Sequence, residues 1–314
     1  MKKVLVITYY WPPSGGAGVQ RWVKFIKYFK DQNIDPYIIS VDPGFASYPV
    51  IDNSLKNDIP ENTNVYLTKT NEPYYFYKKI NNNQTPYAGF ANEGSPSFFQ
   101  KIARFIRGNF FIPDSRKGWN DFAYKKAVEV LEKENIDTVI TTSPPHSTQL
   151  IGLRLKEALN IKWIADLRDP WTDIYYYKSM LHTKWAKRKD LNYEKRVIEK
   201  SDEIVVVSDS IKQLLINKSN LIQESKIHII PNGFDEDDFS VSSTNKNNKF
   251  ILSYVGTITK DYPLDSIKKS ITNLNINLEF TGKADGPTKN SLNEIASFNN
   301  HVKHKESINL LLAS

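Results

Sequence analysis

Apolar residues along the chain form two alternating patterns. Short runs rich in Val and Ile predict strands, and these lie at Lys3–Thr8, Pro36–Val41, Val65–Thr68, Thr138–Thr142, Lys162–Asp166, Glu203–Ser208, Lys226–Ile230, Phe250–Val255, Asn277–Thr281 and His301–Lys303. Between them, apolar residues recur at helical spacing from Val19 to Phe29, from Phe122 to Leu131 and from Leu150 to Leu159. Strands that alternate with helices predict an α/β fold whose parallel sheet is covered on both faces.

Two stretches interrupt this alternation. Residues from about 71 to 112 are rich in Tyr, Asn, Pro and Phe and carry no strong period, so we interpret them as an insertion. Residues 240–249 are polar and lack an apolar anchor, which is typical of a linker. The sequence therefore predicts a first domain at 1–239, a linker at 240–249 and the start of a second domain at 250–314.

The predicted second domain is short. It would hold about 65 residues, whereas a doubly wound sheet usually needs about 100 or more. It also ends in an apolar segment from Ile308 to Ser314 without a helix cap. We expect a C-terminally truncated chain whose second sheet is incomplete, and the alternative is a small lobe that ends in a docked helix.

Composition narrows the function classes. The chain has no cysteine, which excludes disulfide scaffolds, thiolate metal sites and cysteine nucleophiles. No apolar run approaches the roughly 18 residues of a membrane span, and the N-terminal run is too short for a secretory signal. We expect a cytoplasmic protein. The net charge of +7 favours anionic partners without choosing among them.

Basic residues concentrate at 178–200, near Met180, Leu181 and Trp185. This stretch is either a solvated helix face or a surface that rests on an anionic membrane, at the inner face of the cell membrane. We expect no nucleic acid as a partner, because no recognition-helix, RNP or zinc pattern accompanies the charge.

Glycines follow the first predicted strand at Gly15, Gly16 and Gly18. Backbone N–H groups at such a strand-to-helix junction can approach an anion. The segment is not a dinucleotide fingerprint, because Arg21 stands where the third glycine belongs, and no P-loop lysine follows. A turn that only permits close packing is the alternative.

Two further strand ends carry chemistry. Ser143-Pro144-Pro145-His146 follows one predicted strand, so His146 and Ser143 would face the same crevice as the glycines, unless His146 only caps a helix. Asp166-Leu167-Arg168-Asp169-Pro170-Trp171 follows the next strand. The alternative to a functional role for this segment is an internal ion pair between Arg168 and an aspartate, which would brace the loop.

Two last junctions stand on either side of the linker. Pro231-Asn232-Gly233 indicates a tight turn. After the linker, Gly256 would allow another group to come close to the backbone. Lys260 could reach a phosphate or simply be solvated.

The order of these motifs resembles the retaining GT-B glycosyltransferases of the glycosyltransferase family 4 type, which includes sucrose synthase and bacterial mannosyltransferases. The resemblance runs from Lys3 to the end of the chain, and Asp-Leu-Arg-Asp-Pro-Trp and Pro-Asn-Gly-Phe-Asp are its most specific parts. It implies two Rossmann-like doubly wound domains, the first for a saccharide or lipid-linked acceptor and the second for a nucleotide-sugar donor. It implies sugar transfer with retention in bacterial surface polysaccharide synthesis, without a metal or other cofactor.

The resemblance also implies roles for residues. Asp169 and Arg168 would be catalytic, Gly15, Gly16, Gly256 and Lys260 would bind the donor phosphates, and Ser143 and His146 would bind the acceptor. The chain departs from the family at Thr257, where an Arg or Lys is common, and it ends before the family's paired glutamates. We therefore expect this chain alone to be weakly active or inactive. Alternatives are a non-catalytic saccharide or lipid-phosphate binding module and an NAD-dependent sugar-nucleotide epimerase.

Overall fold

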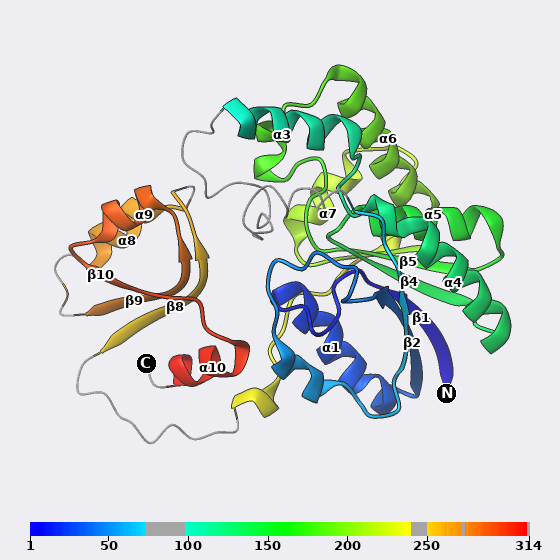
Figure 1. The fold of residues 1–314 in the computed structure, drawn as a ribbon, viewed down its shortest axis with the longest axis horizontal. Helices are drawn as coiled ribbons and strands as arrows, with labels where there is room; N and C mark the ends of the chain where they lie inside the picture. The colour runs from blue at the N-terminus through cyan, green and yellow to red at the C-terminus, as the bar shows by residue number, and fades with distance from the viewer. Residues whose placement is uncertain (73–97, 240–249, 261, 272–273, 275, 313–314) are drawn as a thin grey trace. The chain divides into compact units, whose positions relative to one another are not determined.

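The computed structural model describes residues 1–72, 98–239, 250–260, 262–271, 274 and 276–312 (Figure 1). These residues form two compact units, and the first one runs to Gly233. Most predicted elements are present, whereas the predicted linker at 240–249 lies outside the described residues, as does most of the predicted insertion.

The first unit is a seven-stranded parallel sheet in the order β3-β2-β1-β4-β5-β6-β7. The strands are β1 (Lys2–Ile7), β2 (Ile34–Val41), β3 (Asn64–Thr68), β4 (Thr138–Ser143), β5 (Lys162–Leu167), β6 (Glu203–Val206) and β7 (Ile227–Ile229). The helices are α1 (Ala17–Phe29), α3 (Phe98–Phe110), α4 (Asn120–Glu134), α5 (Ser147–Ala158), α6 (Lys184–Lys200) and α7 (Asp209–Ile216).

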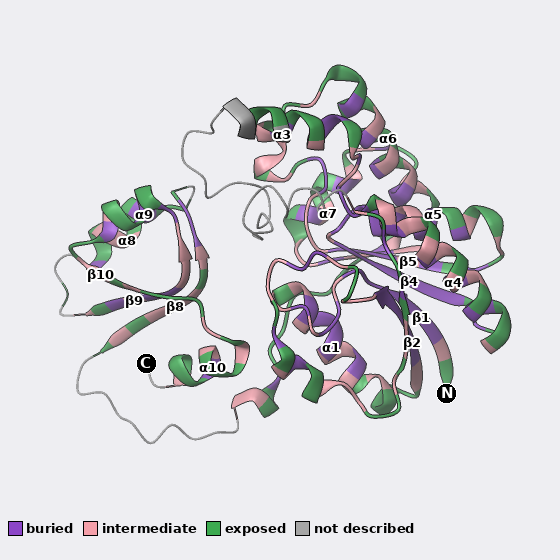
Figure 2. Ribbon diagram, viewed as in Figure 1, coloured by how far each residue is buried: buried purple, intermediate pink, exposed green. Residues whose placement is uncertain are grey.

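The apolar run of strand β1 is unbroken because the strand is buried on both faces. Val4 and Val6 face the core beneath α1, whereas Leu5 and Ile7 face the core beneath α4 and α5. Side chains alternate across a strand, so a strand that is covered on both faces needs apolar residues at every position. Figure 2 shows this central part of the sheet as buried.

The second unit holds a three-stranded parallel sheet in the order β10-β9-β8. Its strands are β8 (Ile251–Ile258), β9 (Asn277–Ala284) and β10 (Ala296–Asn299), and its helices are α8 (Leu264–Ile271), α9 (Gly286–Leu292) and α10 (His304–Leu312). An α/β fold with one large and one smaller parallel sheet is the fold class that the sequence predicts.

One expectation about an individual element is wrong, and one helix was not predicted. The predicted strand at His301–Lys303 lies instead at Ala296–Asn299, where Phe298 stacks on Phe280 of β9 with ring centroids 5.3 Å apart. The predicted insertion contains a helix, α3, which ends at Phe110. The sequence analysis missed this helix although Ile102, Phe105 and Ile106 recur at helical spacing, because the helix is only a small part of the stretch from 71 to 112 that was interpreted as a whole.

We expect Gly152→Ala to destabilise the first unit. A Cβ at Gly152, on α5, would lie 2.2 Å from Nε1 of the fully buried Trp163 on β5. Overpacking of this kind costs about 1–3 kcal/mol of unfolding free energy, which urea denaturation measures. Gly233→Ala is the control, because a Cβ there would meet nothing within 4 Å. Equal stabilities of the two variants would contradict the packing argument.

Candidate functional site

The predicted site residues of the first unit gather at the carboxyl ends of β1, β4 and β5. The strand order reverses between β1 and β4, and such a switch point is where open parallel sheets bind ligands. The glycine loop follows β1, and Ser143 and His146 follow β4. Arg168 and Asp169 follow β5, so the structure brings these predicted residues to one edge of the sheet.

A buried carboxylate, Asp166, lies at the end of β5. Its Oδ2 accepts hydrogen bonds from Trp22 Nε1 at 2.9 Å and from Thr142 Oγ1 at 2.7 Å. Its Oδ1 lies 3.5 Å from a guanidinium nitrogen of Arg21. Asp166 and Arg21 are both buried. Asp166 thus joins α1, β4 and β5 beneath the site.

Arg21 also holds the loop that follows β7. Its guanidinium donates to the carbonyl oxygens of Ile230 and Pro231 and to Oδ1 of Asn232, at 2.9–3.0 Å. The side chain that breaks the dinucleotide fingerprint therefore ties the Pro-Asn-Gly turn to α1. The sequence analysis missed this role, and the single signal for it was the arginine inside an otherwise apolar helix face.

The glycine loop is held in place by its own backbone. The Gly15 N–H donates to the Val50 carbonyl oxygen at 3.0 Å, and a Cβ at Gly15 would lie 3.0 Å from side-chain atoms of Val50 and Asp52. Gly16 precedes α1 with φ of 103°, a conformation that favours glycine. Gly15 therefore anchors the loop through its N–H, and the phosphate-binding role of Gly15 and Gly16 stays a prediction.

Arg168 fastens the loop after β5 to the loop after β4. Its Nε donates to the Ser143 carbonyl oxygen at 3.1 Å and Nη2 donates to that of Pro144 at 3.2 Å. A Cβ at Gly18 would lie 2.6 Å from Nη1, so the glycine leaves room for the guanidinium against α1. Asp166 Oδ2 lies 4.0 Å from Arg168 Nε, which is the internal ion pair that the sequence offered as an alternative.

Ser143 is fully buried and has hydrogen-bond partners. Its Oγ donates to the Asp166 carbonyl oxygen at 3.3 Å and accepts from Gln149 Nε2 at 3.0 Å. In this arrangement Ser143 positions the loop after β4, and its acceptor-binding role stays a prediction.

His146 is buried, and neither of its ring nitrogens has a hydrogen-bond partner. Its ring stacks on Trp171 with centroids 4.8 Å apart. Burial above all, helped by the positive charges of Arg168 and Lys218, lowers the pKa of His146 to about 3. The imidazole is therefore neutral at physiological pH, and each of its two nitrogens is available to donate or to accept one hydrogen bond.

Asp169, after β5, also retains bonding capacity. It forms no hydrogen bond with another residue in the described part of the chain. Burial raises the pKa of Asp169, and the Arg168 guanidinium opposes that rise. A partly buried carboxylate without hydrogen bonds lowers the stability of the folded protein. Such residues are typical of functional sites.

Two buried acidic residues on α6, Asp190 and Glu194, lie near Trp171, and Asp190 forms a hydrogen bond with it. Asp190 accepts from Trp171 Nε1 at 2.8 Å and from the Tyr177 hydroxyl at 3.0 Å. Glu194, one turn later, accepts from Lys218 Nζ at 2.6 Å. Burial raises the pKa of Asp190 to about 7. The signal for this pair was two acidic residues four positions apart in a basic helix.

In the second unit, Gly256 and Gly282 bring β8 and β9 close together. A Cβ at Gly282 would lie 2.0 Å from the Gly256 carbonyl oxygen, and both glycines have φ above +130°. Lys260 is exposed, and its backbone N–H donates to Asp285 Oδ2 at 3.2 Å. A Cβ at Gly256 would lie 3.4 Å from the Tyr254 ring, and the phosphate-binding role of Gly256 and Lys260 stays a prediction.

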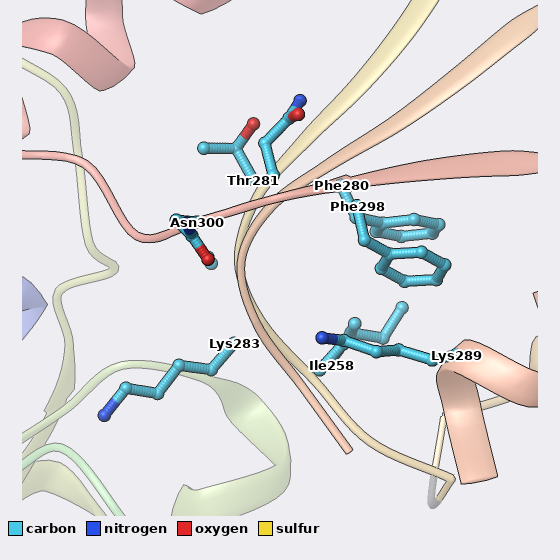
Figure 3. Close-up of a pocket in the computed structure, with 11 residues that line it drawn as sticks. Ile258, Phe280, Thr281, Lys283, Lys289, Phe298 and Asn300 are labelled. Carbon is cyan, nitrogen blue, oxygen red and sulfur yellow. The ribbon is translucent and has the colours of Figure 1, made fainter. Parts of the chain in front are cut away.

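A small pocket opens beside these glycines (Figure 3). The stacked rings of Phe280 and Phe298 lie beside the Lys289 side chain, whose Nζ is 6.0 Å from the Phe298 centroid. Thr281, Lys283 and Asn300 add polar groups to the lining. The pocket therefore combines aromatic surface with two lysines.

Comparison with known proteins gives the fold its context. The family model Glycosyltransferase Family 4 matches residues 87–238. Among solved structures, sucrose-phosphate synthase from Thermosynechococcus elongatus is 12% identical, with TM-score 0.58 over 100% of this chain and 74% of that one. The catalytic domain of starch synthase IV from Arabidopsis thaliana, bound to ADP and acarbose, is 11% identical, with TM-score 0.60 over 100% and 76%.

Anabaena HepE in complex with UDP is also similar, at 11% identity and TM-score 0.54 over 100% of this chain and 72% of that one. No curated protein matches the sequence. Similarity at such low identity establishes the fold alone. The chain therefore has the GT-B fold of glycosyltransferases.

We expect Arg21→Met to destabilise the first unit strongly. It would leave the buried Asp166 carboxylate without its ion-pair partner, and breaking a buried pair costs about 3–5 kcal/mol. Arg154→Met is the matched control, because Arg154 pairs with Asp121 at the surface and such pairs contribute about 1 kcal/mol or less. Urea unfolding measures both, and similar losses would refute the structural role of Arg21.

The raised pKa of Asp190 predicts a pH dependence of stability. The folded protein holds this proton up to about pH 7, whereas the unfolded chain releases it near pH 4. The free energy of unfolding should therefore fall as pH rises from about 4 to about 7, by at most about 1.4 kcal/mol per unit, and level off above. Asp190→Asn should flatten this profile in urea titrations between pH 5 and 8. Parallel profiles would contradict the assignment.

Proposed function

We propose that this protein transfers a glycosyl group from a nucleotide-sugar donor to a saccharide or lipid-linked saccharide acceptor, with retention, in bacterial surface polysaccharide synthesis. One observation carries the proposal. At the switch point of a glycosyltransferase fold, His146 and Asp169 are held partly or fully out of water with bonding capacity that no described residue uses. Groups in this state are suited to bind the hydroxyls of a sugar.

The proposed chemistry assigns separate tasks to these residues. The bond between the sugar carbon and the donor phosphate breaks, and a bond from that carbon to an acceptor hydroxyl forms on the same face. The acceptor hydroxyl loses its proton as the nucleotide diphosphate leaves. The Asp169 side chain accepts a hydrogen bond from a reacting or neighbouring hydroxyl, and neutral His146 binds another without adding charge.

The departing diphosphate needs positive partners. We propose Gly15 and Gly16 for this task in the first unit. As a separate assignment within the second unit, we propose that Gly256 and Lys260 bind the donor phosphates. Arg168, which already donates to two backbone carbonyl oxygens, acts by holding the loops of His146 and Asp169 together and by placing its charge beside them. We propose no metal in the reaction.

We expect Asp169→Asn to lower the rate of transfer at least tenfold without lowering stability. Burial penalises the charged carboxylate, so a neutral amide of the same shape should be tolerated. Steady-state kinetics with the preferred nucleotide sugar and acceptor, together with thermal unfolding, test both parts. Asp121→Asn, at the surface, is the control and should leave the kinetics unchanged. Unaltered kinetics in Asp169→Asn would return Asp169 to a structural role.

The donor and acceptor are found by calorimetry with a panel of nucleotide sugars and a polyprenyl-phosphate acceptor analogue. Binding of both, and transfer that survives EDTA and retains the anomeric configuration in the NMR spectrum of the product, would support the proposal. Acceptor binding without donor binding would overturn it in favour of a non-catalytic module. Bound nicotinamide cofactor in the purified protein would favour the epimerase.

A further inference from the structure

Helix α3 presents its apolar side to solvent. Ile102, Phe105 and Ile106 are exposed, and Phe110 is 73% exposed. The opposite side, with Arg104, faces the protein and is buried. A surface helix normally has the reverse arrangement, with apolar residues inward. An apolar stripe left in water over about two turns indicates a binding surface.

Polar contacts fix α3 in this orientation. The Asn109 side chain donates to the Leu181 carbonyl oxygen at 3.1 Å and accepts from the Thr183 N–H at 2.7 Å. Gly108 lies against the Met180 carbonyl oxygen, which a Cβ would approach to 2.4 Å. The inward side of α3 is thus matched to the segment that leads into α6, so the outward direction of its apolar side is built into the fold (Figure 2).

The segment that leads into α6, which contacts α3, and the first turn of α6 also expose apolar side chains. Leu181 is 47% exposed and Trp185 is 62% exposed. We call this combined surface the α3–α6 face, and it consists of Ile102, Phe105, Ile106, Phe110, Leu181 and Trp185.

Charge on the α3–α6 face has one sign. The segments 98–112 and 178–189 contain no acidic residue. They contain eight basic ones, of which Arg104 is buried on the inward side of α3. The other seven are Lys101, Arg107, Lys178, Lys184, Lys187, Arg188 and Lys189. Apolar side chains interleaved with basic ones match the acyl boundary and the anionic headgroups of a bilayer.

We propose that the α3–α6 face docks on a membrane surface that contains anionic lipids, with α3 lying in the interface. Phe105, Ile106 and Phe110 enter the boundary between headgroups and acyl chains, and the lysines and arginines stay among the headgroups. No helix in the described part of the chain is long and apolar enough to cross a bilayer, so the contact is peripheral. This inference goes beyond sugar transfer and is tested without it.

The apolar contact is tested by vesicle co-sedimentation. The vesicles are phosphatidylcholine with about one third phosphatidylglycerol, and phosphatidylcholine alone. We expect wild type to bind the anionic vesicles, and Phe105→Ser to bind them on the order of tenfold more weakly. Tyr28→Ser, on α1, is the matched control, because Tyr28 and Phe105 are both 42% exposed. Equal binding by the two variants, or equal binding of wild type to both vesicle types, would overturn the proposal.

The charge contribution needs its own variant. Lys184→Gln, Lys187→Gln and Arg188→Gln combined should weaken binding on the order of 100-fold, since each charge near the surface contributes roughly a fivefold change. The control combines Lys30→Gln, Lys125→Gln and Lys133→Gln, which remove the same charge from exposed positions outside the α3–α6 face. Losses of equal size would show that only net charge matters and would refute this face.

Tryptophan fluorescence gives a direct readout of docking. All six tryptophans belong to the described residues, and five of them are at most 3% exposed, whereas Trp185 is 62% exposed. Anionic vesicles should therefore shift the emission to the blue and reduce quenching by acrylamide. Trp185→Phe should retain binding and lose this shift. A shift that persists in Trp185→Phe would contradict docking through this face.

Size-exclusion chromatography with light scattering tests a second copy as the occupant. A wild-type dimer that Phe105→Ser converts to a monomer, together with no vesicle binding, would replace the membrane with a second copy and overturn the proposal. Unchanged thermal unfolding of Phe105→Ser is expected, because the side chain is largely in water. A monomeric wild type that binds anionic vesicles supports the proposal.

Discussion

The carboxylate of Asp166 is the constraint on which the first unit depends. A charge buried at the end of a central strand must be neutralised, and Arg21, Trp22 and Thr142 supply the ion pair and hydrogen bonds that do so. Arg21 and Trp22 come from α1 and Thr142 comes from β4, so satisfying one carboxylate sets the position of α1 against β4 and β5. Because Arg21 also binds the turn after β7, the same network reaches the far end of the sheet.

The site above this network is divided into satisfied and unsatisfied groups. Ser143 and Arg168 have their hydrogen bonds within the protein and hold loops in place. His146 and Asp169 keep bonding capacity, at a cost in stability that the packing around them must offset. Trp171 stacks on the His146 ring, and Asp190 on α6 accepts a hydrogen bond from its indole N–H. This division is why the geometry favours ligand binding over mere bracing of the loops.

The sequence predicted the fold class well, because its signals are local. Short apolar runs and apolar residues at helical spacing both reflect side chains that are buried against a sheet. The run from Val4 to Ile7 is apolar throughout because β1 is buried on both faces. The sequence analysis missed α3, because the helical spacing of Ile102, Phe105 and Ile106 covers only a small part of the Tyr-, Asn- and Pro-rich stretch, and spacing alone does not show that this apolar side faces solvent. At the last strand it placed the element five residues late, because Phe298 alone identifies that edge strand through its stacking on Phe280.

For the candidate site, the sequence by itself determined which residue types stand at the strand ends, because parallel strands all end at one edge and motif order follows chain order. Only the tertiary structure decided which of them are free to act. Hydrogen bonds between Arg168 and the loop after β4, between Gly15 and Val50, and between Arg21 and the turn after β7 join residues 25 to 210 positions apart. No local pattern encodes such pairs, because they depend on how the elements pack in space.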